Sequence, residues 1–143
     1  MKRTGPSLPE GLLGGCAASL NAREIIVMGG YSPISDDFRR EALVLDTLTE
    51  KWVQKIWATL ENGPRLDLSC ASVFWQGEQR VLVAGGWNNS ATTSTEVIDQ
   101  GRFQVVTKKL GDNVYQPLPK QIRSATMVDL GRPIMAGGVI CTG

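Results

Sequence analysis

The sequence predicts an all-β protein built from repeated antiparallel sheets. Three Gly-Gly doublets, at residues 29–30, 85–86 and 137–138, each follow an apolar run of four residues, and they stand 56 and 52 residues apart. A second apolar run precedes each of these runs across a short polar turn. A self-similar period of this size is typical of repeat architectures, which usually act through the surface that they build.

The first two strands of each repeat are expected to form a β-hairpin. Two apolar, β-branched runs that are joined by Asn, Asp or Gly residues are typical of this motif. The runs are residues 16–20 and 25–28 in the first repeat, 70–75 and 81–84 in the second, and 125–128 and 133–136 in the third.

Two further strands are expected after each of the first two doublets. The third strand is residues 41–46 in the first repeat and 95–99 in the second. The fourth strand begins at an aromatic residue, which is Trp52 or Phe103. Each full repeat is therefore predicted to be a four-stranded antiparallel meander, whereas the third repeat contains only its first two strands.

The predicted organisation is a flexible N-terminal segment followed by one repeat segment. Residues 1–8 contain Gly and Pro and are expected to be flexible. Residues 9–143 divide into two full repeats, 9–60 and 61–115, and one partial repeat, 116–143.

The first repeat resembles the kelch repeat. An apolar run, Gly-Gly, a variable loop and then Leu-Val-Leu-Asp-Thr-Leu-Thr-Glu-Lys-Trp at 43–52 follow the kelch pattern. The second repeat departs from it, because Phe103 stands in place of the tryptophan and the turn between its third and fourth strands is shorter. The resemblance covers residues 9–143. It implies a segment of a kelch-type β-propeller, with two four-stranded antiparallel blades and a two-stranded partial blade.

Eight residues are expected to have structural roles. Glycine permits a positive φ and a close approach of neighbouring backbone, which a side chain would prevent. The two aromatic residues are expected to occupy equivalent, mostly buried positions, where a large ring packs between adjacent sheets. The structural residues are Gly29, Gly30, Trp52, Gly85, Gly86, Phe103, Gly137 and Gly138.

Composition and charge exclude several classes of partner. The chain has 143 residues, of which 42% are hydrophobic and 20% are charged, and this composition is typical of a folded domain. Its net charge of +1 gives no electrostatic basis for binding nucleic acid or an anionic membrane. No apolar stretch approaches the roughly 18–20 residues of a membrane span. The first residues contain no apolar stretch of the kind found in a signal peptide, so export by that route is not expected.

The three cysteines predict a reducing compartment and therefore a cytoplasmic location. Cys16 and Cys70 stand at equivalent places in successive repeats, where each is expected to fill a small buried volume. Two alternatives stay open. One is a disulfide between neighbouring blades. The other is a secreted protein, in which the Asn88-Asn89-Ser90 sequon would be able to carry a glycan.

The absence of histidine argues against catalysis. Without histidine the chain cannot supply a Ser-His-Asp or Cys-His arrangement, nor a His-rich zinc or copper site. The carboxylates form no spaced pair that would serve as general acid and base, and Asp46 and Asp99 are expected to form turns. The sequence therefore predicts no enzyme, no catalytic residue, no metal and no cofactor.

A protein partner is expected on one face of the meanders. The loop between strands two and three and the connection to the next repeat share this face, because alternate connections of a meander lie at the same end. Kelch domains that bind acidic peptides use a recurrent arginine here, and the resemblance implies the same role for Arg65. The candidate partner-binding residues are Arg65, Lys120, Arg39, Arg40, Trp87, Asn88, Asn89, Asp36 and Asp37. As structural alternatives, Arg65 and Lys120 would form surface ion pairs, and Trp87 would pack the base of its loop.

The predicted function is that of a protein–protein interaction module. By resemblance, this module is the substrate-recognition part of an intracellular adaptor of the ubiquitin-ligase type. An open array of sheets leaves unpaired edges, so the chain is expected to be a fragment of a longer propeller or to self-associate through those edges. The alternatives are a fragment of a kelch-fold enzyme that acts on sugars or small metabolites, and a secreted kelch protein.

Overall fold

The structure, a computed structural model, describes residues 4–61, 63–75, 77–89, 94–99, 102–105, 122–129 and 133–140. Every regular element in these ranges is a β-strand, and neighbouring strands of each sheet run antiparallel. The all-β prediction is therefore confirmed. The described part of the chain contains no helix that could span a membrane.

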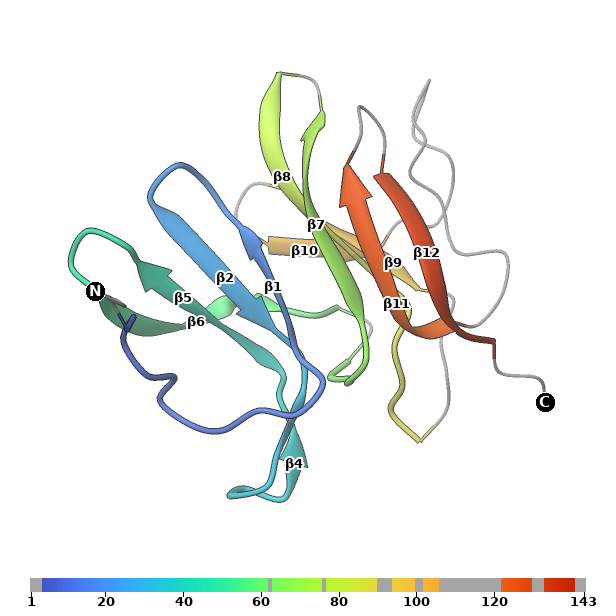
Figure 1. Ribbon diagram of the computed structural model, residues 1–143, viewed down its shortest axis with the longest axis horizontal. Helices are drawn as coiled ribbons and strands as arrows, with labels where there is room; N and C mark the ends of the chain where they lie inside the picture. The colour runs from blue at the N-terminus through green and yellow to red at the C-terminus, as the bar shows by residue number, and fades with distance from the viewer. Residues whose placement is uncertain are drawn as a thin grey trace.

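Two sheets of four strands follow each other along the chain (Figure 1). The first sheet contains, in this order, β1 (Cys16–Ser19), β2 (Glu24–Met28), β5 (Glu41–Asp46) and β6 (Lys51–Thr59). The second contains β7 (Ser69–Trp75), β8 (Glu78–Ala84), β9 (Thr95–Asp99) and β10 (Arg102–Val105). A third sheet pairs β11 (Ile122–Asp129) with β12 (Pro133–Ile140). Each four-stranded sheet is a meander, as the repeats predicted.

A further hairpin, which the sequence analysis did not predict, lies in the loop between β2 and β5. Strand β3 (Tyr31–Ser32) pairs with β4 (Asp37–Phe38), and residues 33–36 form the turn between them. Asp36 has a φ of 54°, a left-handed conformation that Asp adopts more readily than most residues. The loop is therefore a short hairpin that projects from the lower end of the first sheet in Figure 1.

The hydrophobic core lies between the first two sheets. Strands β1, β7 and β11 lie side by side in the middle of the molecule, and each sheet extends away from them (Figure 1). Ile26, Met28 and Val44 of the first sheet form one buried cluster with Val81 and Val83 of the second. Full burial of one such aliphatic side chain stabilises the fold by about 1.5–3 kcal/mol. This cluster therefore holds the two sheets against each other.

The first two glycine doublets stand where two backbones approach closely. Gly29 has a φ of 64°, and a Cβ there would lie 2.6 Å from the carbonyl oxygen of Arg65 and would collide with Leu68. Gly86 has a φ of 104°, and a Cβ there would lie 2.9 Å from the carbonyl oxygen of Leu66. Only glycine combines such a φ with so close an approach. The neighbouring backbone is the connection between the two sheets.

The third doublet differs from the first two. Strand β2 ends at Met28 and β8 ends at Ala84, directly before their doublets. Gly137 and Gly138 instead lie inside β12, where Gly137 pairs with Ala125 of β11. The prediction that every doublet ends its strand is wrong for the third repeat.

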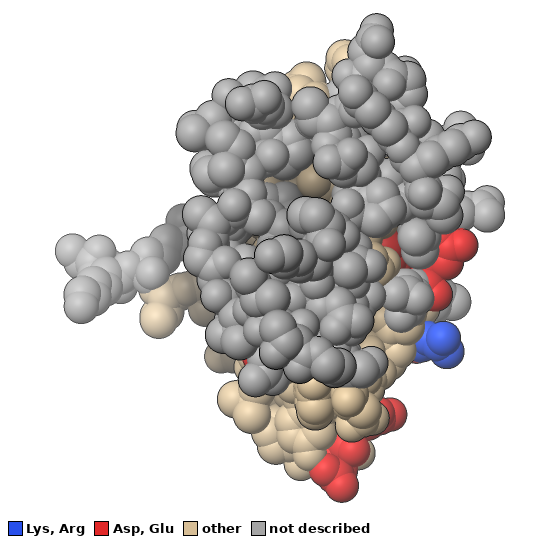
Figure 2. All heavy atoms as spheres, turned by 90° about the vertical axis from the view of Figure 1, so that its right-hand side faces the viewer, with Lys and Arg blue, Asp and Glu red and all other residues tan. Residues whose placement is uncertain are grey.

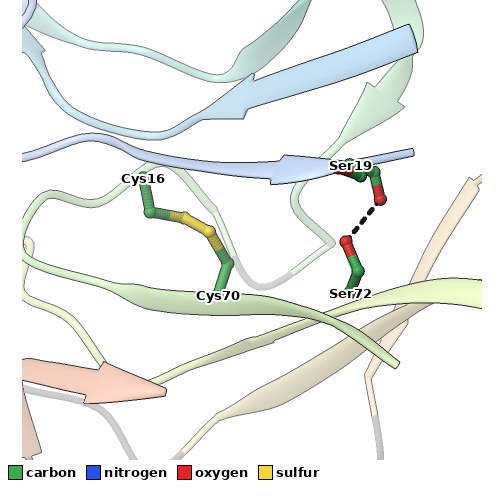
Figure 3. Close-up of a disulfide and its surroundings, with 4 residues drawn as sticks. All are labelled: Cys16, Ser19, Cys70 and Ser72. Atoms are coloured by element: carbon green, nitrogen blue, oxygen red, sulfur yellow. Dashed lines mark hydrogen bonds between the residues drawn. A yellow bond between two sulfur atoms is a disulfide. The ribbon is translucent and has the colours of Figure 1, made fainter. Parts of the chain in front are cut away.

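A one-residue difference in register brings Cys16 and Cys70 face to face. Cys16 pairs with Met28, directly before the first doublet, whereas Cys70 pairs with Val83, two residues before the second. Because side chains alternate between the two faces of a strand, this shift turns the two thiol-bearing side chains toward each other. They form a disulfide bond between β1 and β7, with their Cα atoms 6.0 Å apart (Figure 3).

The disulfide corrects two predictions from the sequence. Cys16 and Cys70 are not structurally equivalent, and they do not fill separate volumes, so the alternative of a disulfide between neighbouring sheets is the one that the structure contains. Farther along the same strands, the hydroxyl of Ser72 donates a hydrogen bond to the carbonyl oxygen of Ser19 at 2.6 Å (Figure 3). Strands β1 and β7 are therefore linked at two points.

Trp52 is partly buried in β6, where it pairs with Leu45. Its indole Nε1 donates a hydrogen bond to the carbonyl oxygen of Pro6 at 3.3 Å, so the N-terminal segment lies beside the ring. Phe103 pairs with Ile98 of β9 in the corresponding position after the turn. The predicted equivalence of Trp52 and Phe103 is confirmed for the backbone, and the side chain of Phe103 lies outside the described residues.

Candidate functional site

The long loops gather at one end of the sheets. Residues 29–40, residues 85–89 and the connection at residues 60–68 leave the sheets at the lower end of the molecule in Figure 1, and we call this end the loop face. The opposite end carries the tight turns at residues 20–23 and 47–50. This is the arrangement predicted from the alternating connections of a meander.

Tyr31 and Trp87 occupy the same place in successive repeats, directly after their doublets. Tyr31 exchanges two backbone hydrogen bonds with Leu13, at 2.8 and 2.9 Å. Trp87 exchanges the same pair of bonds with Leu66, at 2.8 and 3.0 Å. Each aromatic residue is therefore anchored to the segment that leads into the first strand of its sheet.

Phe38 joins these two aromatic residues into one row across the two repeats. The centroid of its ring lies 5.8 Å from that of Tyr31, at an interplanar angle of 71°, and 6.1 Å from that of Trp87, at 60°. Aromatic pairs favour such edge-to-face and tilted arrangements. We call Tyr31, Phe38 and Trp87 the aromatic row. All three are partly buried, so each packs against the loops and still presents part of its surface to solvent.

Arg65 does not point outward from the loop face. Its exposed fraction is 2%, and its Nη1 lies 2.6 Å from Oε2 of Glu96, a carboxylate whose exposed fraction is 0%. Its Nε donates a hydrogen bond to the carbonyl oxygen of Gly85 at 2.6 Å. The structure corrects the expectation of a surface cation at this position, because the charge of Arg65 is used inside the chain.

The sequence analysis did not single out Glu96 as the partner of Arg65. Glu96 stands in β9, and its counterpart in the first sheet is the apolar Leu43, which has the same register relative to the doublet. The Oε1 atom of Glu96 accepts a hydrogen bond from the backbone nitrogen of Glu61 at 2.5 Å. Glu96 lies between Thr95 and Val97, which are both buried. A carboxylate between such residues was the available sequence signal for an ion pair, because buried charges in proteins are paired.

Arg39 is also paired within the chain. Its Nη1 forms an ion pair with Oε1 of Glu10, and its side chain is 19% exposed. The hydroxyl of Ser32 donates a hydrogen bond to the other oxygen of Glu10 at 2.7 Å. Glu10 therefore attaches the β3–β4 hairpin to the N-terminal segment and neutralises a cation that was predicted to meet a partner.

The other candidates divide into residues held by the chain and residues that are exposed. The hydroxyl of Tyr31 donates a hydrogen bond to Asp36, and this bond raises the pKa of Tyr31. The side-chain nitrogen of Asn88 donates to the carbonyl oxygen of Pro64 at 2.7 Å. Lys120 lies outside the described residues. Asp36 is nevertheless exposed, as are Asp37, Arg40 and Asn89.

The chemistry of the loop face is that of a contact surface. Within the described ranges, no group of three or more His, Cys, Asp or Glu side chains is placed to hold a metal ion. Leu13 and Ile34 leave 59% and 81% of their surface exposed beside the aromatic row and at the tip of the hairpin. Partly exposed aromatic and apolar side chains with a polar rim are typical of protein interfaces.

The sequence comparisons agree with the resemblance to kelch repeats. The chain is 34% identical over 96 residues to an F-box/kelch-repeat protein of Arabidopsis thaliana. The matched part is 66% of this chain and 26% of that protein, so the chain spans about a quarter of its relative's length. No protein-family model matches the chain. The chain is therefore similar in sequence to a kelch-repeat protein over about two thirds of its length.

Proposed function

We propose that this chain is a kelch-type β-propeller segment that binds a protein partner through its loop face. The observation that carries the proposal is the aromatic row, because it makes one continuous surface from the loops of two successive repeats. A surface shared between repeats is how repeat scaffolds usually recognise their partners.

The propeller architecture has two supports. Successive meanders pack with their first strands side by side, which is the order of strands around the centre of a propeller. The sequence is also similar to that of a protein whose name includes the kelch repeat. In this proposal the first two sheets are complete blades and β11–β12 is part of a third.

The same comparison supports a more specific role. The relative is an F-box/kelch-repeat protein, and the resemblance implies an adaptor in which the kelch part recognises the substrate. We therefore propose that this chain supplies the substrate-recognition part of a ubiquitin-ligase-type adaptor.

Two matched substitutions test the binding face. Ile34 on the loop face and Leu48 on the opposite turn are both apolar and exposed, by 81% and 74%. Ile34→Gln is expected to abolish capture of the partner in a pull-down with the whole chain, whereas Leu48→Gln is expected to retain it. The proposal is wrong if Leu48→Gln loses the partner and Ile34→Gln keeps it.

One observation favours a secreted protein over the predicted cytoplasmic one. The disulfide between Cys16 and Cys70 is a bond that persists in oxidising compartments and is rare in the cytosol. As a second candidate we therefore propose a kelch-type interaction protein of an oxidising compartment, which would take the place of the ubiquitin-ligase-type adaptor. The test is to alkylate protein from its natural source before reduction. Labelling of Cys16 and Cys70 by the alkylating reagent would instead support the cytoplasmic location.

A further inference from the structure

The charges of the loop face are distributed differently from the prediction. An acidic partner was expected because Arg65 and Lys120 were predicted to meet carboxylates, with Arg39 among the outer contacts. Arg65 is instead buried against Glu96, Arg39 is paired with Glu10, and Lys120 lies outside the described residues. In the described loop between β2 and β5, the exposed charged side chains are Asp36, Asp37 and Arg40. Two carboxylates and one cation therefore remain there.

The two carboxylates stand at one end of the aromatic row. Asp36 accepts a hydrogen bond from the hydroxyl of Tyr31, which leaves its second oxygen to a partner. Asp37 is next to Phe38 in β4 and pairs across the hairpin with Ser32, the neighbour of Tyr31. On the face that Figure 2 shows, red acidic side chains lie at the lower end of the molecule, the end from which the hairpin projects in Figure 1.

Aromatic rings beside carboxylates form a site for a cation. An arginine or lysine above an aromatic face is attracted by the ring quadrupole, and the attraction grows when the pair is desolvated. Arginine also stacks flat on a ring while its N–H groups donate to a carboxylate. It would therefore contact both the rings and the carboxylates at this end of the aromatic row. A glutamate or aspartate placed here would face Asp36 and Asp37, and like charges in contact suppress binding.

We propose that the partner presents a basic segment, with an arginine side chain stacked on the aromatic row and paired with Asp36 or Asp37. This inference rests on the proposed function, because it names the chemistry of the partner that engages the loop face. It replaces the acidic peptide that the sequence analysis expected.

The test uses two short labelled peptides, one of alternating arginine and alanine and one of alternating glutamate and alanine. Their binding to the whole chain is followed by fluorescence anisotropy. We expect saturable binding of the arginine peptide, and no saturable binding of the glutamate peptide. Asp36→Asn with Asp37→Asn is expected to weaken binding of the arginine peptide by roughly threefold to tenfold, because it removes the partly solvated ion pairing with these carboxylates.

A matched double variant distinguishes binding at this site from a general effect of the net charge of the chain. Glu78→Gln with Glu50→Gln removes the same two negative charges from turns on the opposite face, and it is expected to leave the affinity for the arginine peptide unchanged. The inference is overturned if this control weakens binding as much as the aspartate variant, if the arginine peptide does not saturate, or if the glutamate peptide binds more tightly.

The two proposals fail in different ways. If Ile34→Gln abolishes capture of a partner but the captured binding segment is acidic, the loop face is the binding face and the basic partner is wrong. If Leu48→Gln abolishes capture and Ile34→Gln does not, the proposed binding face fails and the basic segment fails with it.

Discussion

At the scale of single residues, Asp46 shows how one carboxylate organises a turn. One of its oxygens accepts hydrogen bonds from the backbone nitrogens of Leu48 and Thr49, at 2.9 and 3.2 Å. Both oxygens also face the guanidinium of Arg23. The hydrogen bond from Arg23, followed by the backbone bonds, holds the pKa of Asp46 well below its usual range. The turn-forming role predicted from the sequence is confirmed.

The lowered pKa of Asp46 predicts how stability depends on pH. Because the folded-state pKa lies below that of the unfolded chain, about 3.9, the stabilising contribution is complete above that pH and is lost as the pH falls through the folded-state value. Asp46→Asn should therefore be less stable than wild type at pH 7, and the difference should shrink in acid. Urea unfolding of both proteins between pH 7 and acidic pH measures this difference in the free energy of unfolding. A difference that grows in acid would contradict the argument.

Arg65 and Glu96 form a buried ion pair, with side-chain exposures of 2% and 0%. Arg65→Ala should destabilise the chain by about 3–5 kcal/mol, because it leaves the carboxylate of Glu96 buried without its cation. The double variant Arg65→Met with Glu96→Leu should be more stable than Arg65→Ala, since no charge is left behind. Guanidinium unfolding would show both effects. A loss of stability below about 1 kcal/mol in Arg65→Ala would mean that the pair contributes no more than an exposed surface ion pair does.

At the scale of elements, the disulfide depends on the register of β1 relative to β7. The sequence alignment matched Cys16 with Cys70 because both begin an apolar run, but a one-residue slip changes the face on which every side chain of a strand lies. Sequence similarity between repeats could not detect the slip. The pairings of Cys16 with Met28 and of Cys70 with Val83 show it.

The disulfide should stabilise the fold measurably. It joins residues 54 positions apart, so it restricts a long loop of the unfolded chain, and its loss should lower the free energy of unfolding by about 2–4 kcal/mol. Cys16→Ser with Cys70→Ser should show this loss in denaturant unfolding. A reducing agent should then destabilise wild type by a similar amount and leave the double variant unchanged. Equal sensitivity of both proteins to the reducing agent would argue against the bond.

Two glycine substitutions distinguish the effect of the close backbone approach at the first doublet from the effect of backbone strain. Gly29 and Gly63 both have a positive φ, 64° and 84°, but a Cβ on Gly63 would meet nothing within 4 Å. Gly63→Ala should therefore destabilise by about 1 kcal/mol through strain alone, within the range for a non-glycine residue in this conformation. Gly29→Ala should lose more stability than Gly63→Ala, because its Cβ would also collide with Arg65 and Leu68. Equal losses in thermal unfolding would refute the close approach.

At the scale of the whole molecule, the repeat pattern predicted the strands of the three main sheets and the position of the loop face, but not the β3–β4 hairpin. This succeeded because hydrophobic runs and glycine doublets report local structure, which each repeat specifies on its own. The charges of the loop face could not be predicted in the same way. Arg65 and Arg39 look like surface cations in the sequence, and the carboxylates that neutralise them, Glu96 and Glu10, lie 31 and 29 residues away in the chain.

Arg65 also affects how the two repeats open. Its carbonyl oxygen accepts a hydrogen bond from the nitrogen of Gly30 at 2.9 Å, and its side chain donates to the carbonyl oxygen of Gly85 at 2.6 Å. Arg65 is thus hydrogen-bonded to the glycine doublet at the start of the long loop in both repeats. Neither loop can separate from Arg65 without losing one of these hydrogen bonds. Where neighbouring repeats are coupled in this way, they open as one cooperative unit, and hydrogen exchange at Gly30 should report the opening of both. The proposed binding surface is then either complete or absent, and a partner would meet no half-formed version of it.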